Sequence, residues 1–111
     1  MGEYWKPVNV TRKEYVRAHR VDEGLKLSEW TWPGSRVMAI VATWGPTDDI
    51  RIVSDYYGDI RVTDAAKGSA IEASYDLCEE DPSWVSIEST CGRDPQNTDT
   101  VRAVIRAVKE W

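Results

Sequence analysis

Residues 49–64, DIRIVSDYYGDIRVTD, decide the fold. The stretch contains two runs of similar sequence, DIRIV at 49–53 and DIRVT at 59–63. Both runs alternate apolar and polar side chains, and this period of two is typical of β-strands that bury one face. The buried faces are expected to be made by Ile50 and Ile52 in the first strand and by Ile60 and Val62 in the second.

The connection between the two runs is predicted at Tyr57-Gly58-Asp59. Glycine adopts a positive φ without a steric penalty, which is what a tight hairpin turn demands. Either Tyr57-Gly58 or Gly58-Asp59 fits as the central pair of a two-residue turn. We therefore interpret the stretch as a β-hairpin.

The segments before the hairpin mix extended and helical patterns. Residues 3–10 favour an extended start, and Pro7, which lacks an N–H, predicts either an edge strand or a strand that begins after it. Residues 14–19 are predicted as a second short strand, with a helix as the alternative. Residues 24–30 are predicted to contain a short helix capped by Asp22 or Gly24.

The most hydrophobic run of the chain covers residues 36–44, and its pattern fits two structures. Its β-branched residues favour a buried strand. Ser35 is a good N-cap and Gly45-Pro46 is a good stop signal, and both favour a helix. A helix packed across the sheet is the preferred interpretation.

Beyond the hairpin, the sequence predicts a loop at 65–69, an amphipathic helix at 70–80, a strand at 84–88, a loop at 91–97 and a C-terminal helix. The last of these has the clearest pattern, because Val101, Val104, Ile105 and Val108 form one apolar stripe. Thr98 or Asp99 is its expected cap, and Asp99 and Lys109 match the helix dipole. The predicted fold is a single small α+β domain over residues 1–111, with a mostly antiparallel sheet, a central hairpin and two to three packed helices.

The charge of the chain is uneven along its length. Residues 1–36 carry seven Lys or Arg and five Asp or Glu, whereas residues 47–81 carry three and ten. An acidic segment of this kind disfavours nucleic-acid binding, which needs clustered Lys and Arg, and suits a basic protein partner. The aromatic residues, six Trp and five Tyr without Phe, suit interface rims as well as cores.

The N-terminal residues show no signal peptide, and no stretch of the sequence reaches transmembrane length, so a cytoplasmic protein is expected. Cys78 and Cys91 are then expected to be reduced, although a disulfide between them is compatible with the sequence. They lack the paired spacing of a zinc site. The sequence contains no phosphate-binding glycine loop and no nucleophile motif.

The residues around the hairpin loop are the main candidates for a functional site. Tyr56 and Tyr57 are predicted to project from the tip among carboxylates, as aromatic anchors and steering charges for a basic partner. The predicted partner-binding set is Asp48, Asp49, Asp55, Tyr56, Tyr57, Asp59 and Asp64. The same aspartates lack the spacing of a calcium-binding loop, so no metal site is predicted.

His19 is the single histidine and supplies an alternative site. It lies between arginines, which disfavour its charged form and would suit a general base near neutral pH. Asp22 and Glu23 are the nearest carboxylates that it could use, so His19, Asp22 and Glu23 form the alternative ligand site.

The N-terminal part of the chain carries Met1-Gly2-Glu3-Tyr4, then Asn9, His19 and Gly24-Leu25-Lys26-Leu27. This pattern, M-G-x-Y followed by N, H and G-L-K-L, resembles that of a group of short uncharacterised bacterial hypothetical proteins. Residues 58–62 are similar to a later stretch of the same group. The resemblance implies a shared fold and no catalytic activity.

Two hypotheses for the function follow from these observations. The leading one is a small, acidic, non-enzymatic protein-interaction module that binds a basic surface on another protein and needs no cofactor. A phage-type inhibitor of a bacterial defence complex, such as an anti-CRISPR protein acting partly by nucleic-acid mimicry, fits the size and charge. The alternative is a small enzyme or ligand-binding domain built on His19. A homodimer formed through an exposed hairpin edge is compatible with both.

Overall fold

The predicted hairpin is present and makes one side of the sheet. The computed structural model describes residues 4–56, 58–90, 92–93 and 98–111. Strand β3 (Ile50–Ser54) pairs antiparallel with β4 (Asp59–Arg61), with Ile52 opposite Ile60. The four apolar side chains expected on one face all lie in the main hydrophobic core, as predicted: Ile50, Ile52, Ile60 and Val62.

The turn of this hairpin is longer than predicted. Val53 pairs with Asp59, so five residues separate these two paired positions and the prediction of a two-residue turn is wrong. The reason is the pleat of the strands. A two-residue turn at either predicted pair would place inward-facing residues opposite outward-facing ones, whereas an odd-numbered loop keeps Ile52 opposite Ile60. Gly58 has the expected positive φ, at 90°.

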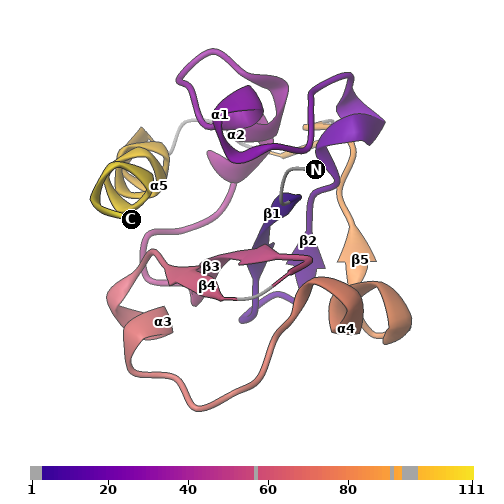
Figure 1. Cartoon of the computed structure of the whole chain (residues 1–111), viewed down its shortest axis with the longest axis vertical. Helices are drawn as coiled ribbons and strands as arrows, with labels where there is room; N and C mark the ends of the chain where they lie inside the picture. The colour runs from indigo at the N-terminus through magenta and orange to yellow at the C-terminus, as the bar shows by residue number, and fades with distance from the viewer. Residues whose placement is uncertain (1–3, 57, 91, 94–97) are drawn as a thin grey trace.

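Within the described residues, the sheet has five strands in the order β4-β3-β1-β2-β5. The additional strands are β1 (Trp5–Asn9), β2 (Glu14–Tyr15) and β5 (Val85–Ser86). Each of their pairings is antiparallel except that of β2 with β5, which is parallel. Figure 1 shows β4 and β5 at the two edges of this sheet, with β1 between them. The predicted α+β class with a mostly antiparallel sheet is therefore confirmed.

Pro7 lies in the middle of the central strand, so its interpretation as the mark of an edge strand or of a later start is wrong. β1 pairs with β3 along its whole length, whereas its pairing with β2 covers only Val8 and Asn9. The Pro7 carbonyl faces β2 and accepts a hydrogen bond from the N–H of Val16 at 3.1 Å. The N–H that proline lacks would point to this same side, so the longer ladder with β3 loses no bond. Only the reciprocal bond from position 7 to the Val16 carbonyl is missing.

The helix interpretation of the hydrophobic run is confirmed. Helix α2 (Arg36–Val41) begins after Ser35, whose hydroxyl accepts a hydrogen bond from the N–H of Met38 at 3.0 Å. It is preceded by a 3-10 helix, η1 (Ala18–Val21), and by α1 (Leu27–Trp30). The predicted caps of α1 are wrong: the helix begins after Lys26, whose N–H donates to the Glu29 carboxylate.

The C-terminal helix α5 (Thr98–Glu110) is also confirmed. Val104 is fully buried, and the rest of the predicted stripe packs partly buried against the main core. Asp99 and Lys109 lie in the first and last turns as expected. Because Thr98 and Asp99 already belong to the helix, neither of them is its N-cap.

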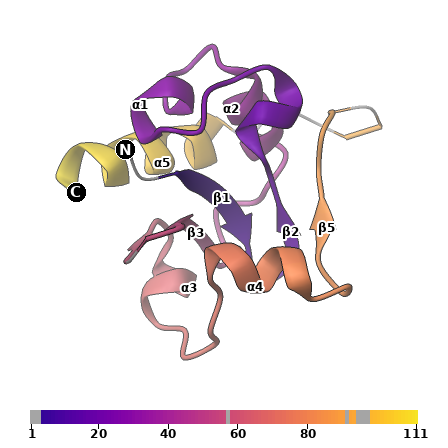
Figure 2. The same ribbon diagram turned by 45° about the vertical axis from the view of Figure 1, so that its right-hand side comes forward.

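Two helices lie between β4 and β5 in the sequence. Helix α3 (Asp64–Lys67) occupies a segment predicted as a loop, because the Thr63 hydroxyl caps it by accepting from the N–H of Ala66. Helix α4 (Tyr75–Glu80) begins five residues later than predicted, with Ser74 as its N-cap. Figure 2 shows α1, α2 and α5 on one side of the sheet and α3 and α4 on the other.

The core has one part on each side of the sheet. The main cluster packs the sheet against the helices α2 and α5 and contains Trp5, Trp30 and Trp44. The smaller cluster lies on the side of α4. It consists of Val8, Val10, Tyr15, Val53, Cys78 and Trp84.

Candidate functional site

The acidic segment 47–81 covers one side of the molecule. Apart from β3 and β4, its helices and connections lie below the sheet in Figures 1 and 2. Four of its ten carboxylates, those of Asp48, Asp49, Asp59 and Glu79, form ion pairs with Lys or Arg. Within the described part of the chain, no ion pair holds the others: Asp55, Asp64, Glu72, Asp76, Glu80 and Asp81.

A hollow of about 420 Å³ lies on this side, between the hairpin loop and the start of α4. We call it the acidic hollow. The residues that line it include three aspartates and two tyrosines: Asp55, Asp59, Asp76, Tyr56 and Tyr75. The structure therefore brings together three of the predicted partner-binding residues, Asp55, Tyr56 and Asp59, and adds two from α4.

The hairpin loop is held in place at Asp55. Its carboxylate accepts a hydrogen bond from the N–H of Tyr4 at 2.9 Å, and its own N–H donates to the Tyr4 carbonyl at 3.0 Å. Tyr56, the next residue, is 76% exposed. Tyr57 lies outside the described residues. The loop thus presents an exposed aromatic ring beside a carboxylate that the backbone positions.

A buried lysine lies behind Tyr75. The Nζ atom of Lys6 is 4.1 Å from the centre of the Tyr75 ring and 4.7 Å from that of Tyr15. It donates to the Tyr75 carbonyl and lies 3.5 Å from the Glu79 carboxylate. The sequence does contain a signal for this burial, since Lys6 shares its strand face with Val8 and Val10. The charge of lysine hides this signal in the sequence, because lysine is seldom fully buried.

Burial shifts the pKa values in this cluster. Desolvation lowers the pKa of Lys6 and raises that of Tyr75 to about 12. The Tyr75 hydroxyl is therefore protonated at neutral pH, and Tyr75 is one of the residues that line the acidic hollow. Cys78, a free and buried thiol, has its pKa raised to about 11, again chiefly by burial.

The thiol of Cys78 is expected to make the fold sensitive to alkali. Its pKa rises from 9.0 to about 11 on folding, so the folded state keeps the proton longer than the unfolded state. The stabilising contribution is complete below pH 9 and falls by about 2–3 kcal/mol as the pH rises to 11. Urea unfolding of the natural chain and of Cys78→Ala at pH 8 to 11 tests this. The natural chain should lose about 2–3 kcal/mol more stability over this range than the variant, which has no thiol to titrate. Parallel profiles would contradict the prediction.

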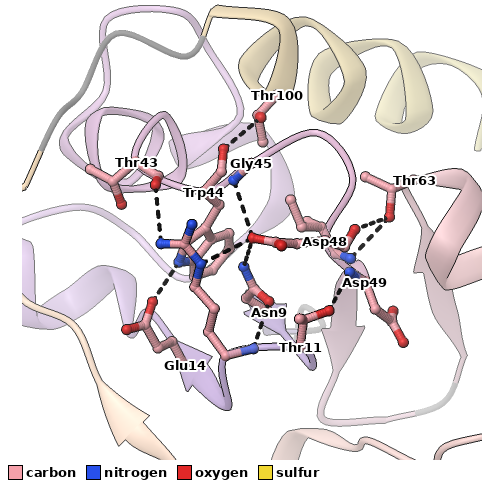
Figure 3. A network of polar contacts seen from close by, with 12 residues as sticks. Asn9, Thr11, Glu14, Thr43, Trp44, Gly45, Asp48, Asp49, Thr63 and Thr100 are labelled. Carbon is pink, nitrogen blue, oxygen red and sulfur yellow. Dashed lines mark hydrogen bonds and ion pairs between the residues drawn. The ribbon is translucent and has the colours of Figure 1, made fainter.

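Asp48 belongs to the framework rather than to the acidic hollow. Its carboxylate accepts hydrogen bonds from the Asn9 side chain at 2.9 Å and from the Gly45 N–H at 3.1 Å, and it pairs with Arg12 at 3.1 Å. Figure 3 shows this network, in which Thr63 donates to the Asp48 carbonyl. These contacts join the turn before β3 to the end of β1.

The same network extends to the main core. The indole N–H of Trp44 donates to Glu14 at 2.9 Å, and Arg93 pairs with the same carboxylate at 2.8 Å. The Thr100 hydroxyl donates to the Trp44 carbonyl at 2.7 Å, as Figure 3 shows. The network therefore connects β2, the end of the α2 segment and the start of α5.

Asp49 and Asp64 are also separate from the acidic hollow. The Asp49 carboxylate is buried and binds the buried Arg51 guanidinium through two hydrogen bonds of 2.9 Å. Asp64 is exposed in the first turn of α3 and does not line the hollow. The described members of the predicted set thus divide into three residues in the hollow, two carboxylates held inside the framework, and Asp64, which lies apart from both.

The alternative site is not assembled by the described contacts. His19 is exposed in η1 and lines none of the hollows described in this structure. Asp22 pairs with Arg36 at 2.7 Å, and Glu23 accepts a hydrogen bond from the Arg36 N–H at 2.8 Å. Both carboxylates are therefore engaged by Arg36 rather than directed at His19.

Metal binding and membrane spanning are two further properties that bear on the kind of site. Among the described residues, no group of three or more His, Cys, Asp or Glu side chains is arranged to hold a metal ion. The helices of the described part are all too short or too polar to cross a membrane.

Comparison of the chain with protein-family models, with curated proteins and with solved structures finds no match. The resemblance to the bacterial group therefore stays a prediction, and the functional argument rests on the geometry of the acidic hollow.

Proposed function

We propose that this chain is a small, acidic, non-enzymatic protein-interaction module that binds a basic surface on another protein through the acidic hollow. The observation that carries the proposal is the convergence of Asp55, Asp59 and Asp76 around one concavity beside two tyrosine rings. Carboxylates that lack a cation of their own attract Lys and Arg, and aromatic faces hold such cations further.

The charges around the hollow support a cationic guest. Of its three carboxylates, only that of Asp59 forms an ion pair within the described residues, with Arg61 at 3.1 Å. Asp55 and Asp76 form no ion pair with any described residue, so a Lys or Arg side chain of the partner would supply their counter-charge. The narrower hypothesis of a phage-type inhibitor is one form of this proposal.

We expect a defined cationic peptide to bind in the hollow. A hexa-arginine peptide titrated into labelled protein should shift the amide NMR signals of Asp55, Gly58, Asp59 and Asp76, and the shifts should weaken as salt screens the charges. Removing two charges with Asp55→Asn plus Asp76→Asn should weaken binding about tenfold. The amide oxygen introduced by Asp55→Asn can still accept the Tyr4 N–H, so the loop should keep its position.

The matched control is Glu72→Gln plus Glu80→Gln, which removes the same charge from exposed positions on the same side but outside the hollow. This control should bind almost as tightly as the natural sequence. Equal weakening by both double variants would mean that the overall acidity, and not the hollow, attracts the peptide. That outcome would remove the basis for the proposed site.

A further inference from the structure

Strand β4 ends the sheet and leaves an open edge of backbone groups. The N–H of Val62 donates to the Ile50 carbonyl at 3.0 Å, so Val62 and Ile60 direct their N–H and C=O groups toward β3. The intervening residues direct theirs outward, because neighbouring residues of a strand alternate. The N–H and C=O of Asp59 and Arg61 therefore face away from the sheet, and no described backbone group pairs with them.

Charges of opposite sign lie side by side on this edge. Asp59 and Arg61 share one face of β4 and pair at 3.1 Å through Asp59 Oδ2 and Arg61 Nε. Arg61 Nη1 donates to the carbonyls of Ala66 and Ser69. Within the described part of the chain, this leaves Asp59 Oδ1 as an acceptor and Arg61 Nη2 as a donor without a partner.

We propose that two copies of this chain associate through β4, antiparallel and about a two-fold axis at Ile60. The outward groups of Asp59 then exchange hydrogen bonds with those of the partner's Arg61, and the reverse pair does the same. The short sequence Asp-Ile-Arg is self-complementary in this register. Each aspartate lies opposite an arginine of the other copy, which is a favourable cross-strand pair.

The same register gives the exposed C-terminal tryptophan a contact. Trp111 is 64% exposed and lies over Gly58, where a Cβ atom would be 3.6 Å from its ring. A groove of about 420 Å³ lies beside β4, and Val62, Ala103 and Trp111 contribute to its walls. The two-fold axis places the partner's Gly58 opposite Val62 and thereby brings the partner's Trp111 toward this groove. An edge strand with charged ends, and a groove of mixed polar and apolar lining beside it, are thus matched by a second copy.

Sedimentation equilibrium over a range of concentrations tests this association. We expect the weight-average mass to rise from 12.6 kDa toward twice that value. Asp59→Lys places two lysines opposite two arginines, so it should weaken association by at least about tenfold. Glu80→Lys makes the same change of charge at an exposed position outside the edge and should leave association unchanged.

A mixing experiment identifies the register. Asp59→Lys alone opposes like charges, and Arg61→Asp alone does so too, but a mixture of the two places Lys opposite Asp and Arg opposite Asp. We expect the mixture to form heterodimers although neither variant associates alone. A mass that stays at 12.6 kDa at every concentration of the natural chain would overturn the proposal. Equal effects of Asp59→Lys and Glu80→Lys on association would also overturn the proposal. This comparison does not need Arg61→Asp, so it remains decisive if that variant fails to fold. If the natural chain stays monomeric but still binds the cationic peptide, the dimer proposal fails while the proposal for the acidic hollow stands.

Discussion

Asp49→Ala is expected to lower the free energy of unfolding by about 3–5 kcal/mol, because it leaves a buried guanidinium without its counter-charge. Arg51 is 1% exposed and bonds both oxygens of Asp49 at 2.9 Å. A loss of this size approaches the whole stability of a small domain. Chemical denaturation, followed by tryptophan fluorescence, measures it.

The control is a double variant in which Asp49 becomes Leu and Arg51 becomes Met. Removing both charges of a buried pair and filling the space with apolar atoms is often close to neutral. The double variant should therefore recover most of the stability that Asp49→Ala loses. If Asp49→Ala costs less than about 1 kcal/mol, as for an exposed ion pair, Arg51 must reach water in the variant and the pair is not essential.

Trp44→Ala is expected to cost about 3–5 kcal/mol as well, through a cavity in the main core. The Trp44 side chain is fully buried, and its indole N–H donates to Glu14 at 2.9 Å. The substitution removes the ring from the space between the sheet and α5 and also breaks the link to β2. Thermal unfolding with a probe other than tryptophan fluorescence, such as far-ultraviolet circular dichroism, measures the effect.

Trp44→Phe separates packing from hydrogen bonding. Phenylalanine keeps most of the ring contacts but has no N–H, so the expected loss is about 1–2 kcal/mol. Glu14 remains paired with Arg93 at 2.8 Å in that variant and is not left isolated. A loss as large for Trp44→Phe as for Trp44→Ala would show that the hydrogen bond to Glu14, and not the volume of the ring, holds this part of the core.

Local patterns predicted the parts of the fold that depend on neighbouring residues. The alternation in residues 49–64 identified both strands of the hairpin and their buried faces. Ser35 identified the start of α2, and the valine stripe identified α5. The odd number of loop residues was also within reach, because a shared buried face for Ile50, Ile52, Ile60 and Val62 excludes a two-residue turn at either predicted pair.

Other features depend on contacts that no local pattern contains. β1 holds the central position despite Pro7 because the missing N–H faces β2 and not the longer ladder with β3. The parallel pairing of β2 with β5 joins segments that are distant in the sequence. Asp48 and Asp49 carry the same charge as the exposed aspartates, and only their Arg partners in the fold make them internal. Tyr75 and Asp76 were missed as site residues because helix α4 meets the hairpin loop only in three dimensions.

The strand order has a consequence for the folding of the chain. The β3–β4 hairpin pairs segments that are close in the sequence, whereas the pairing of Glu14 in β2 with Val85 in β5 joins segments that are far apart in the sequence. A pairing between such distant segments loses chain entropy before its contacts form, and it slows folding relative to local pairings. We therefore expect the hairpin to form early in folding and the parallel pairing of β2 with β5 to form late.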